Sequence, residues 1–438
     1  MIPETLTQKK RIWLWASFDF ANSLGFVTVT LYFPLWLVKD HHVSDLWVSV
    51  PVALSTIVLF FTIPPLGTLS DRLQRRHPFL IFTTLLACFT LLLLGLIGMN
   101  VQTFTPFIFA TVIILYFLFQ YFYQASLGFY YSFLHQLSNA QPKEKISGLG
   151  FAAGQLGNVV GLIVALPFAI GTIPLWSQNS RATTFLIGAI LFFLCALPML
   201  FFFKEDQYYN LKHADIERKG WMSSFTNTFK DLRHIRRYPG ILSYLLVYYF
   251  FADAILTLQL FSGLYFEVVG GLNDQQKTFL GIGTLLIAIL GGLLSARISQ
   301  QIKSMRRSIA LFILSMSIAL LGLSIAKGLV FLIGISLLNG FFFGAVFSLS
   351  RAYFSELVPP DRQGQFFSVY VLFERFASVL GPLVWSGTVL LSASLGTEMQ
   401  YCNFTISSKK REERCKICVP KRSEVELHIV IKVTYDNM

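Results

Sequence analysis

Two aspartates stand inside long apolar runs, where a charged side chain is costly. Asp19 lies in the run that begins near Trp13, and Asp253 lies in the run that follows residue 240. A charged group at the centre of a bilayer costs about 2.5 to 3.5 kcal/mol on insertion scales, so such residues usually face a cavity or a partner. Burial also favours the protonated form of a carboxyl group, as proton coupling requires. Both aspartates are therefore candidates for solute binding or proton coupling, and Asp253, nearer the middle of its run, is the stronger one. The alternative is that each fixes helix packing through local hydrogen bonds.

A short charged turn separates two other apolar runs. It extends from Gly67 to Arg76 and includes Asp71, Arg72 and Arg75. The glycine allows close helix contact, the aspartate can cap the start of the next helix, and the arginines hold the turn at a membrane surface. We interpret these five residues as a conformational gate. The alternative is a charged loop that only sets the topology.

The turn recurs in weaker form between Gly292 and Gln301, where Ala296 stands in place of the aspartate. A second repeat relates Phe133–Gly161 to Tyr353–Gly381. Each of these segments starts with an aromatic residue, continues through a charged turn that contains proline, and ends at a glycine. Two repeats at similar spacing indicate that the chain is a duplication.

The composition is that of a membrane protein. The 438 residues are 54% hydrophobic and only 13% charged, and the mean hydropathy is +0.61. Apolar stretches of about 20 residues, the length that a helix needs to cross about 30 Å of hydrocarbon, recur along the chain. They predict about eleven spans, the last over residues 365–392, and hence an all-α, multi-pass protein surrounded by the lipid bilayer.

The basic residues follow the same topology. The net charge is +12, but Lys and Arg prefer short cytoplasmic loops. With a cytoplasmic N-terminus, most of them fall on the cytoplasmic side. Before the C-terminal tail, the loops on the outer side hold only Lys39, Arg181, Lys277 and Lys327. The charge therefore predicts the orientation, and no nucleic acid is expected as a partner.

The long polar segment near the middle divides the chain. We predict an N-terminal half with six helices (1–203), a cytoplasmic linker loop (204–240), a C-terminal half with five helices (241–394) and an aberrant polar tail (395–438). The tail would emerge on the outer face although it is basic, against the charge rule. We interpret it as foreign sequence that replaced a twelfth helix, as a frameshift would do. The alternative is a genuine extracytoplasmic tail after eleven spans.

Other polar residues within the spans are also candidates for the solute site. Gln155 and Asn158 project from a glycine-rich run, either as cavity groups or as partners in hydrogen bonds between helices. Glu374 and Arg375 are adjacent, so they point about 100° apart on a helix and cannot share one face. Either of them could contact the solute, or each could form a structural ion pair with another helix.

Some of these segments resemble a known family. The turn has the pattern Gly-x-x-x-Asp-Arg-x-x-Arg-Arg and resembles the signature loop of major facilitator transporters, where the acidic and basic residues are implicated in latching the cytoplasmic side. Phe18–Ser23, which contains Asn22, and Ser350–Pro360, which contains Arg351, resemble the vacuole-effluxer (autophagy-related) family, in particular its bacterial members. Glu374 stands where this resemblance leads us to expect a small residue.

The resemblance implies a major facilitator fold, with two pseudo-symmetric helical halves and a twelfth helix missing here. It implies a secondary active transporter that moves a small polar solute, such as an amino acid or similar metabolite, by alternating access. Asn22 joins the aspartates as a candidate solute residue, and Arg351 joins the gate. Proton-coupled efflux is the hypothesis for the driving force. The alternatives are a transport-inactive remnant and a substrate-sensing membrane receptor.

Other classes of protein are not indicated. The sequence has no Gly-x-x-x-x-Gly-Lys-Ser/Thr loop for nucleotide phosphates, and its histidines lack the spacing of metal ligands. Cys415 and Cys418 have no second ligand pair at zinc-like spacing. We therefore expect no enzyme activity, no cofactor and no metal. We expect a monomer in a bacterial cytoplasmic (inner) membrane, with the N-terminus in the cytoplasm.

Overall fold

The computed structural model describes residues 4–43, 46–73, 75–137, 142–173, 180–205, 239–268, 270–272, 274–325 and 328–377. All of them belong to one compact unit, Met1–Trp385. These residues form helices joined by short turns, and no strand occurs among them. The prediction of an all-α fold is confirmed.

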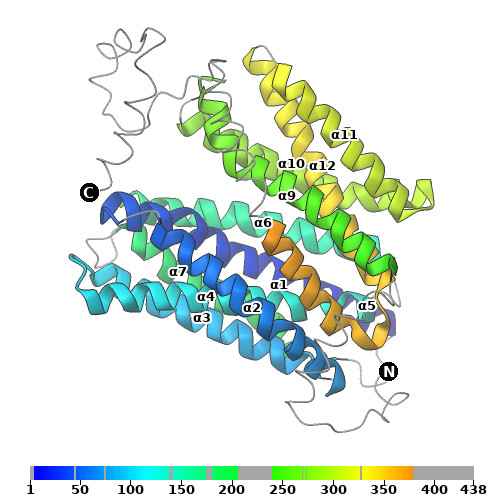
Figure 1. Ribbon diagram of the computed structural model, residues 1–438, viewed down its shortest axis with the longest axis horizontal. Coiled ribbons are helices and arrows are strands. Elements are labelled where there is room, and N and C mark those ends of the chain that lie inside the picture. The colour runs from blue at the N-terminus through cyan, green and yellow to red at the C-terminus, as the bar shows by residue number, and fades with distance from the viewer. Residues whose placement is uncertain are drawn as a thin grey trace, which may run out of the picture. The chain divides into compact units, whose positions relative to one another are not determined.

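The first group of helices precedes residue 205. α1 (Glu4–Pro34) continues into a turn of π-helix, η1 (Leu35–Asp40). The other members are α2 (Leu46–Arg72), α3 (His77–Asn100), α4 (Pro106–Ser132), the short α5 (Leu134–Leu137), α6 (Lys143–Ala169) and α7 (Ser180–Phe202). α1 packs against α6 and α7, while α3 lies beside α4 and α7 (Figure 1).

The second group follows residue 238. It contains α9 (Pro239–Val268), α10 (Asp274–Ile302), α11 (Met305–Ile325) and α12 (Leu329–Leu357). A 3-10 turn, η4 (Pro360–Arg362), then leads into a further helix that is described over residues 363–377. α10, α11 and α12 lie side by side (Figure 1).

The described part of the chain contains 10 helices that are long and apolar enough to cross a membrane. The 363–377 helix begins where the sequence predicts an eleventh span, and the remainder of that span lies outside the described residues. Large apolar side chains such as Phe107, Phe279 and Val330 are exposed on the outside of the helices. Such exposure is expected of a surface that faces lipid.

Each group has its own hydrophobic core. The larger core is built almost entirely from the first group and includes the fully buried Trp15, Trp36 and Phe119. The second core is built from α9, α11, α12 and the 363–377 helix, around Tyr248 and other aromatic residues. The domain boundaries predicted from the sequence are compatible with these cores but stay a prediction. The linker 206–238 and the tail 395–438 lie outside the described residues.

Glycines bring particular helices into close contact. On α6, a Cβ at Gly157 would collide with the carbonyl oxygen of Phe20 on α1, and one at Gly161 would lie 2.9 Å from the carbonyl oxygen of Leu24. α10 and α12 approach each other in the same way at Gly340, where a Cβ would lie 2.6 Å from the Thr284 carbonyl oxygen. Each group therefore contains at least one pair of helices whose backbones nearly touch.

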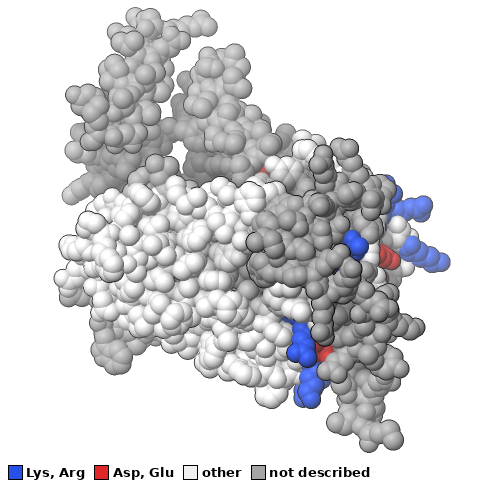
Figure 2. All heavy atoms as spheres, turned by 60° about the horizontal axis from the view of Figure 1, so that its bottom comes forward, with Lys and Arg blue, Asp and Glu red and all other residues white. Residues whose placement is uncertain are grey.

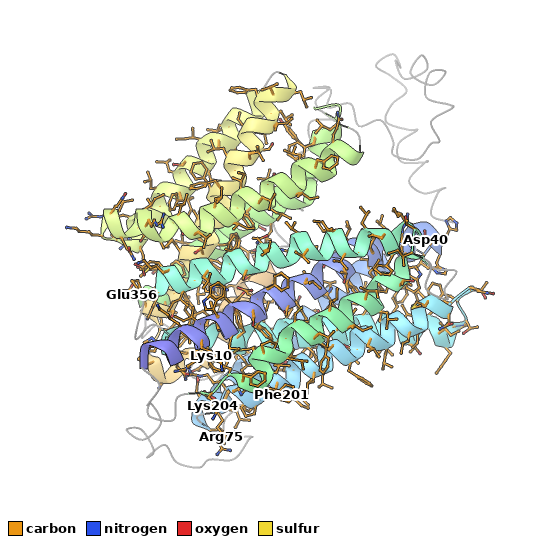
Figure 3. The ribbon with its side chains drawn as sticks, turned by 180° about the vertical axis from the view of Figure 1, so that it is seen from behind. Lys10, Asp40, Arg75, Phe201, Lys204 and Glu356 are labelled. Carbon is orange, nitrogen blue, oxygen red and sulfur yellow. The ribbon has the colours of Figure 1, made fainter. Side chains whose placement is uncertain are left out.

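The charged residues gather at one end of the helices, here called the basic end. Figure 3 places Lys10, Arg75, Lys204 and Glu356 at this end and Asp40 at the other. In Figure 2, blue side chains lie at one end while the face along the helices is white. This separation is the one that the charge pattern of the sequence predicts for the two sides of a membrane.

Candidate functional site

The first part of the predicted gate is helical, because α2 continues through Arg72, whereas Arg75 and Arg76 lie in the turn before α3. Asp71 therefore lies in the last turn of α2, where it is buried. Its Oδ1 accepts a hydrogen bond from the backbone N–H of Gly364 (3.0 Å), and its Oδ2 accepts one from Gln365 (2.8 Å). Asp71 thus caps the N-terminus of the 363–377 helix, where two free N–H groups and the helix dipole favour a carboxylate. We expected it to cap the next helix instead.

Arg76 completes this contact from the first group. Its Nε donates to Asp71 Oδ1 over 2.7 Å, and the two side chains are 8% and 7% exposed. Its Nη2 donates to the carbonyl oxygen of Pro360 in η4 (3.4 Å). The start of α3 is capped by Glu205, whose carboxylate accepts from the N–H groups of Arg76 and His77 at 3.0 and 3.1 Å. Because Glu205 caps α3, the Asp71 carboxylate can bind the second group of helices instead.

Two glycines allow this approach. A Cβ at Gly67 would lie 2.5 Å from the carbonyl oxygen of Gly364, and a Cβ at Gly364 would lie 2.7 Å from Asp71 Oδ1. Arg75, by contrast, is exposed. Within the described part of the chain, its side chain makes no hydrogen bond or ion pair. The side chain of Arg72 lies outside the described residues.

The weaker copy of the turn forms the matching contact between α10 and α6. Ser295 donates to the carbonyl oxygen of Gly292 (2.7 Å), as Ser70 does to that of Gly67 (2.7 Å). A Cβ at Gly148 on α6 would lie 2.5 Å from the Gly292 carbonyl oxygen. Because Ala296 has no carboxylate, this second contact needs another polar group to hold it.

Arg351 on α12 supplies the polar side chain for the contact between Gly292 and Gly148. Its Nη2 donates to the carbonyl oxygen of Ser147 on α6 (2.8 Å), and its Nε donates to Ser147 Oγ (3.1 Å). Ser147 Oγ in turn donates to the carbonyl oxygen of Ser348 on α12 (2.5 Å). The guanidinium also lies 5.0 Å from the ring of Trp15 and 5.1 Å from that of Tyr131, within the range of cation–π attraction.

Asp19 is the charged partner of Arg351. Arg351 Nη1 donates to Asp19 Oδ2 over 3.0 Å, and the side chains are only 7% and 10% exposed. The pair joins α1 of the first group to α12 of the second. We expected Asp19 in the solute site and Arg351 in the gate, and the structure brings them together. An ion pair this deeply buried is broken at a cost of several kcal/mol if one partner loses its charge.

A second polar cluster surrounds Asn22, one turn further along α1. Asn22 Nδ2 donates to Tyr123 Oη on α4 (3.2 Å), and Tyr123 stacks on Phe26 with ring centroids 4.2 Å apart. The Arg375 guanidinium lies 5.9 Å from the Phe26 ring and interacts electrostatically with Tyr123. Asn22 Oδ1 and both amide atoms of Gln124 are buried without a hydrogen-bond partner among the described residues.

Glu374 belongs to the same region but binds within the second group. Its Oε2 accepts from Tyr248 Oη on α9 (3.0 Å), and the Tyr248 ring lies against Tyr370 with centroids 4.3 Å apart. The adjacent Arg375 points toward the first group. The expectation that these neighbours face different partners is consistent with these contacts.

The remaining candidates have partners of their own. Asn158 Nδ2 donates to Gln155 Oε1 on the same helix (3.1 Å), so these two partly buried side chains bind each other. Asp253 is buried on α9, where it interacts electrostatically with Tyr249. In the described residues, no group of His, Cys, Asp and Glu is arranged to hold a metal ion.

Several site residues were missed by sequence reasoning. Ser147, Tyr131 and Tyr248 are ordinary components of apolar runs, and nothing in their local pattern marks them. Gln124 could have been noticed, because it is an amide within an apolar run, like Gln155. Glu205 could have been noticed, because it is an acidic residue just after α7 in a basic segment. The others were accessible only through the packing of helices distant in the sequence.

At the opposite end, an ion pair joins two elements of the first group. Arg181 on α7 binds Asp40 of η1. His41, next in the chain, packs against Trp36 and Phe104, and its burial lowers the pKa of the imidazole, so the ring is neutral at pH 7. Among the described residues, the hydrogen bonds and ion pairs between the two groups therefore lie toward the basic end.

Such an arrangement can hold two helix groups together reversibly. Asp71 and the Asp19–Arg351 pair form two charged connections between the groups, and each would break if the groups separated at the basic end. The polar cluster around Asn22 lies between them and the opposite end. Its amide, phenol and charged groups suit binding of a polar solute rather than covalent chemistry.

Comparison with known proteins identifies relatives over most of the chain. The profile described as Major Facilitator Superfamily matches residues 17–382. The "Uncharacterized MFS-type transporter YxiO" of Bacillus subtilis is 23% identical over 403 residues, which cover 87% of this chain and 89% of that protein. "Autophagy-related protein 22-1" of Neosartorya fischeri is 22% identical over 266 residues, covering 55% of this chain and 42% of that protein.

Solved structures share the fold. The human organic anion transporter MFSD10 (TETRAN) superposes with a TM-score of 0.68 at 13% identity, over 88% of this chain and 95% of that one. FucP, the E. coli fucose:proton symporter, in the outward conformation, gives a TM-score of 0.65 at 14% identity, over 88% of this chain and 92% of that one. At these identities the likeness concerns the fold alone.

Proposed function

The chain belongs to the Major Facilitator Superfamily, and we propose that it moves a small polar solute by alternating access between its two groups of helices. Membership makes it a multi-pass membrane protein that transports some solute. In this architecture the solute site lies between the halves near the middle of the membrane, and the halves rock around it. The structure would then represent a state that is closed at the basic end.

One observation carries the proposal: the buried Asp19–Arg351 ion pair joins the two groups through two helices that are long and apolar enough to cross a membrane. A charged pair inside a membrane protein is costly unless it has a function or excellent geometry. Here the geometry is good, with Ser147 and two aromatic rings completing the surroundings of the guanidinium. We interpret the pair, together with Asp71, as the closure that must open in each transport cycle.

The solute is proposed to bind at the cluster of Asn22, Tyr123, Gln124, Glu374 and Arg375. The buried amide oxygen of Asn22 and both amide atoms of Gln124 have no hydrogen-bond partner among the described residues, so they could exchange hydrogen bonds with it. Neighbouring acidic and basic side chains suit a solute that bears both charges. An amino acid or a similar metabolite, the solute class implied by the family resemblance, would meet this condition.

Proton coupling is proposed at Asp19. Protonation of this carboxylate would remove the charge on which the ion pair depends, so acidification is expected to favour opening at the basic end. The charged and titratable groups around Asp19 are Arg351 on α12, Tyr123, Tyr130 and Tyr131 on α4, and Glu374 on the 363–377 helix. The contacts favour Asp19 over Asp253, which reverses the order suggested by the sequence.

The location is also a proposal. The basic end would face the cytoplasm by the preference of Lys and Arg for that side, with the N-terminus there. The similarity to a Bacillus subtilis protein over most of the chain supports a bacterial cytoplasmic membrane. A monomer would suffice, because the proposed site is formed within one chain.

The test is solute flux in proteoliposomes that contain the full chain. A thermal-shift screen of amino acids and related metabolites would first identify a solute, and its uptake would then be measured with and without a pH gradient. We expect saturable flux in the wild type and accumulation driven by the gradient. Asp19→Asn should keep downhill flux but lose this accumulation.

The comparison variant is Asp253→Asn, which should still accumulate the solute. If Asp253→Asn alone abolished accumulation, the coupling role would return to Asp253. Saturable binding without any flux would instead favour a substrate-sensing receptor, and neither binding nor flux would favour an inactive remnant.

A further inference from the structure

Glu374 lies in the second group together with Arg351, the residue that must leave Asp19 when the basic end opens. It sits on the 363–377 helix, and its carboxylate is held by Tyr248 of α9. Arg351 sits on α12 of the same group. A separation of the two groups would therefore move Arg351 away from Asp19 but would leave it in the same group of helices as Glu374.

The electrostatic surroundings of Glu374 include both members of the ion pair. It interacts with Arg375, Arg351 and Asp19, in addition to Tyr248. Tyr131 of α4 lies between Arg351 and Tyr370, because its ring is 5.1 Å from the Arg351 guanidinium and 6.2 Å from the Tyr370 ring. Tyr370 in turn lies against Tyr248, the hydrogen-bond donor to Glu374.

Arg375 also acts electrostatically on Glu374, but its side chain points in another direction. Adjacent residues on a helix point about 100° apart, and Arg375 lies over the ring of Phe26 in the first group. Glu374 points instead toward α9 and the second group. Glu374 therefore binds the second group of helices, while Arg375 contacts the first.

Arginine cannot lose its proton inside a protein. A guanidinium that leaves its counter-ion at membrane depth needs another, since an unpaired buried charge costs several kcal/mol. Tyr131 belongs to the first group and would be left behind in a separation. Glu374 is the acidic residue of the described second group that already interacts with Arg351.

We propose that Glu374 is the second counter-ion of Arg351, which it stabilises when the two helix groups separate at the basic end. Arg351 then has a carboxylate partner in both states, Asp19 when this end is closed and Glu374 when it is open. Asp19, left alone in the open state, takes up a proton. The proposal rests on the proposed function and makes Glu374 a positioning residue for the conformational change.

The experiment measures the distance between the two groups at the basic end of the full chain. Spin labels are attached at Lys10→Cys on α1 and Glu356→Cys on α12, two exposed positions at this end (Figure 3), after the native cysteines are replaced by serine. Electron–electron double resonance then reports the ratio of open to closed molecules as a function of pH, with and without Asp19→Asn.

We expect Asp19→Asn to raise the proportion of open molecules. Adding Glu374→Gln should lower the ratio of open to closed molecules at least about tenfold, because Arg351 then lacks a carboxylate in the open state. Glu374→Gln alone should move the pH midpoint of opening to lower pH, since opening becomes less favourable. Glutamine still accepts the Tyr248 hydrogen bond, so the fold is retained. Glu374→Asp should restore most of the ratio.

The matched control is Glu144→Gln, which removes a carboxyl at the start of α6 without touching the cluster. The inference is overturned if Asp19→Asn opens the basic end and Glu374→Gln leaves the ratio and the midpoint unchanged. An increase in open molecules with Glu374→Gln would overturn it as well. If Asp19→Asn itself leaves the end closed, the closure by Asp19 and Arg351 is wrong, and the proposed function fails at that point.

Discussion

Asp71 and Asp19 hold the two groups of helices together through different partners. Asp71 binds the free N–H groups at the start of the 363–377 helix, so its partner is a helix terminus. Asp19 binds the guanidinium of Arg351. The first interaction depends on backbone geometry and the second on a pair of charges. A carboxylate is required in both cases, and protonation would weaken both.

We expect removal of the Asp71 carboxylate to destabilise the protein more than removal of the Asp19 carboxylate. We expect Asp71→Ala to lower the free energy of unfolding by at least about 2 kcal/mol, because it removes a helix cap and leaves the buried Arg76 without its counter-ion. Denaturant unfolding in detergent, followed by tryptophan fluorescence, measures this change.

Arg75→Ala is the control for this prediction, since its exposed side chain makes no polar contact in the described part of the chain. It should change the free energy of unfolding by less than about 0.5 kcal/mol. Equal effects of the two substitutions would mean that the turn acts only through its charge at the membrane surface.

The sequence identified these residues unevenly. Asp71, Arg76 and Gly67 belong to a pattern that marks the gate, and Asp19 stands out because a carboxylate is rare in an apolar run. Their partners could not be predicted, because Arg351 follows Asp19 by more than 300 positions and no local rule relates them. Glu374 was noticed as unusual, but its bond to Tyr248 depends on the packing of α9 against the 363–377 helix.

Helix α1 and helix α6 pack through glycines, and so do α10 and α12 in the other group. Gly157 lies against the backbone of Phe20, and Gly344 lies against that of Ala288. Close backbone contact of this kind gives each group a rigid pair of helices. Rigid pairs are what a rocking motion requires, because the charged connections can then break while the groups keep their shape.

A methyl group at this contact should therefore be destabilising. We expect Gly157→Ala to lower the free energy of unfolding by about 1–3 kcal/mol, because the helices must move apart to accommodate the added Cβ. Gly334→Ala is the matched control in α12, where a Cβ would have nothing within 4 Å.

The control substitution should stabilise the protein slightly, by up to about 1 kcal/mol, since alanine is the better helix former. Thermal unfolding of both variants in the same detergent provides the comparison. A stabilising effect of Gly157→Ala would contradict the close packing of α1 and α6.

The helices themselves were largely predictable, because length and apolarity are the properties that a bilayer selects. Their ends were less so. α1 changes to a π-helical turn after Pro34, which removes a backbone donor, and α2 extends through residues that we interpreted as a loop. Both differences arise where proline or tertiary contacts override the hydropathy pattern.

At the scale of the whole molecule, the duplication seen in the sequence reappears as a pair of contacts between the groups. Gly67 meets Gly364, and its counterpart Gly292 meets Gly148. The two contacts are secured differently, by Asp71 in one and by Arg351 in the other. The sequence showed the asymmetry, because Ala296 stands in place of an aspartate. It did not show that Arg351 compensates for the missing carboxylate. The family match confirms the transporter class, while the solute and its coupling remain proposals.

The central claim is that the Asp19–Arg351 pair closes the basic end and that the opposite end moves reciprocally. The most direct measurement is a pair of label distances in the full chain, Lys10 to Glu356 at the basic end and Phe107 to Val330 at the opposite end, where α4 and α12 begin. For Asp19→Asn, we predict a longer distance at the basic end and a shorter one at the opposite end. Two unchanged distances, or two that lengthen together, would contradict alternating access controlled by this pair.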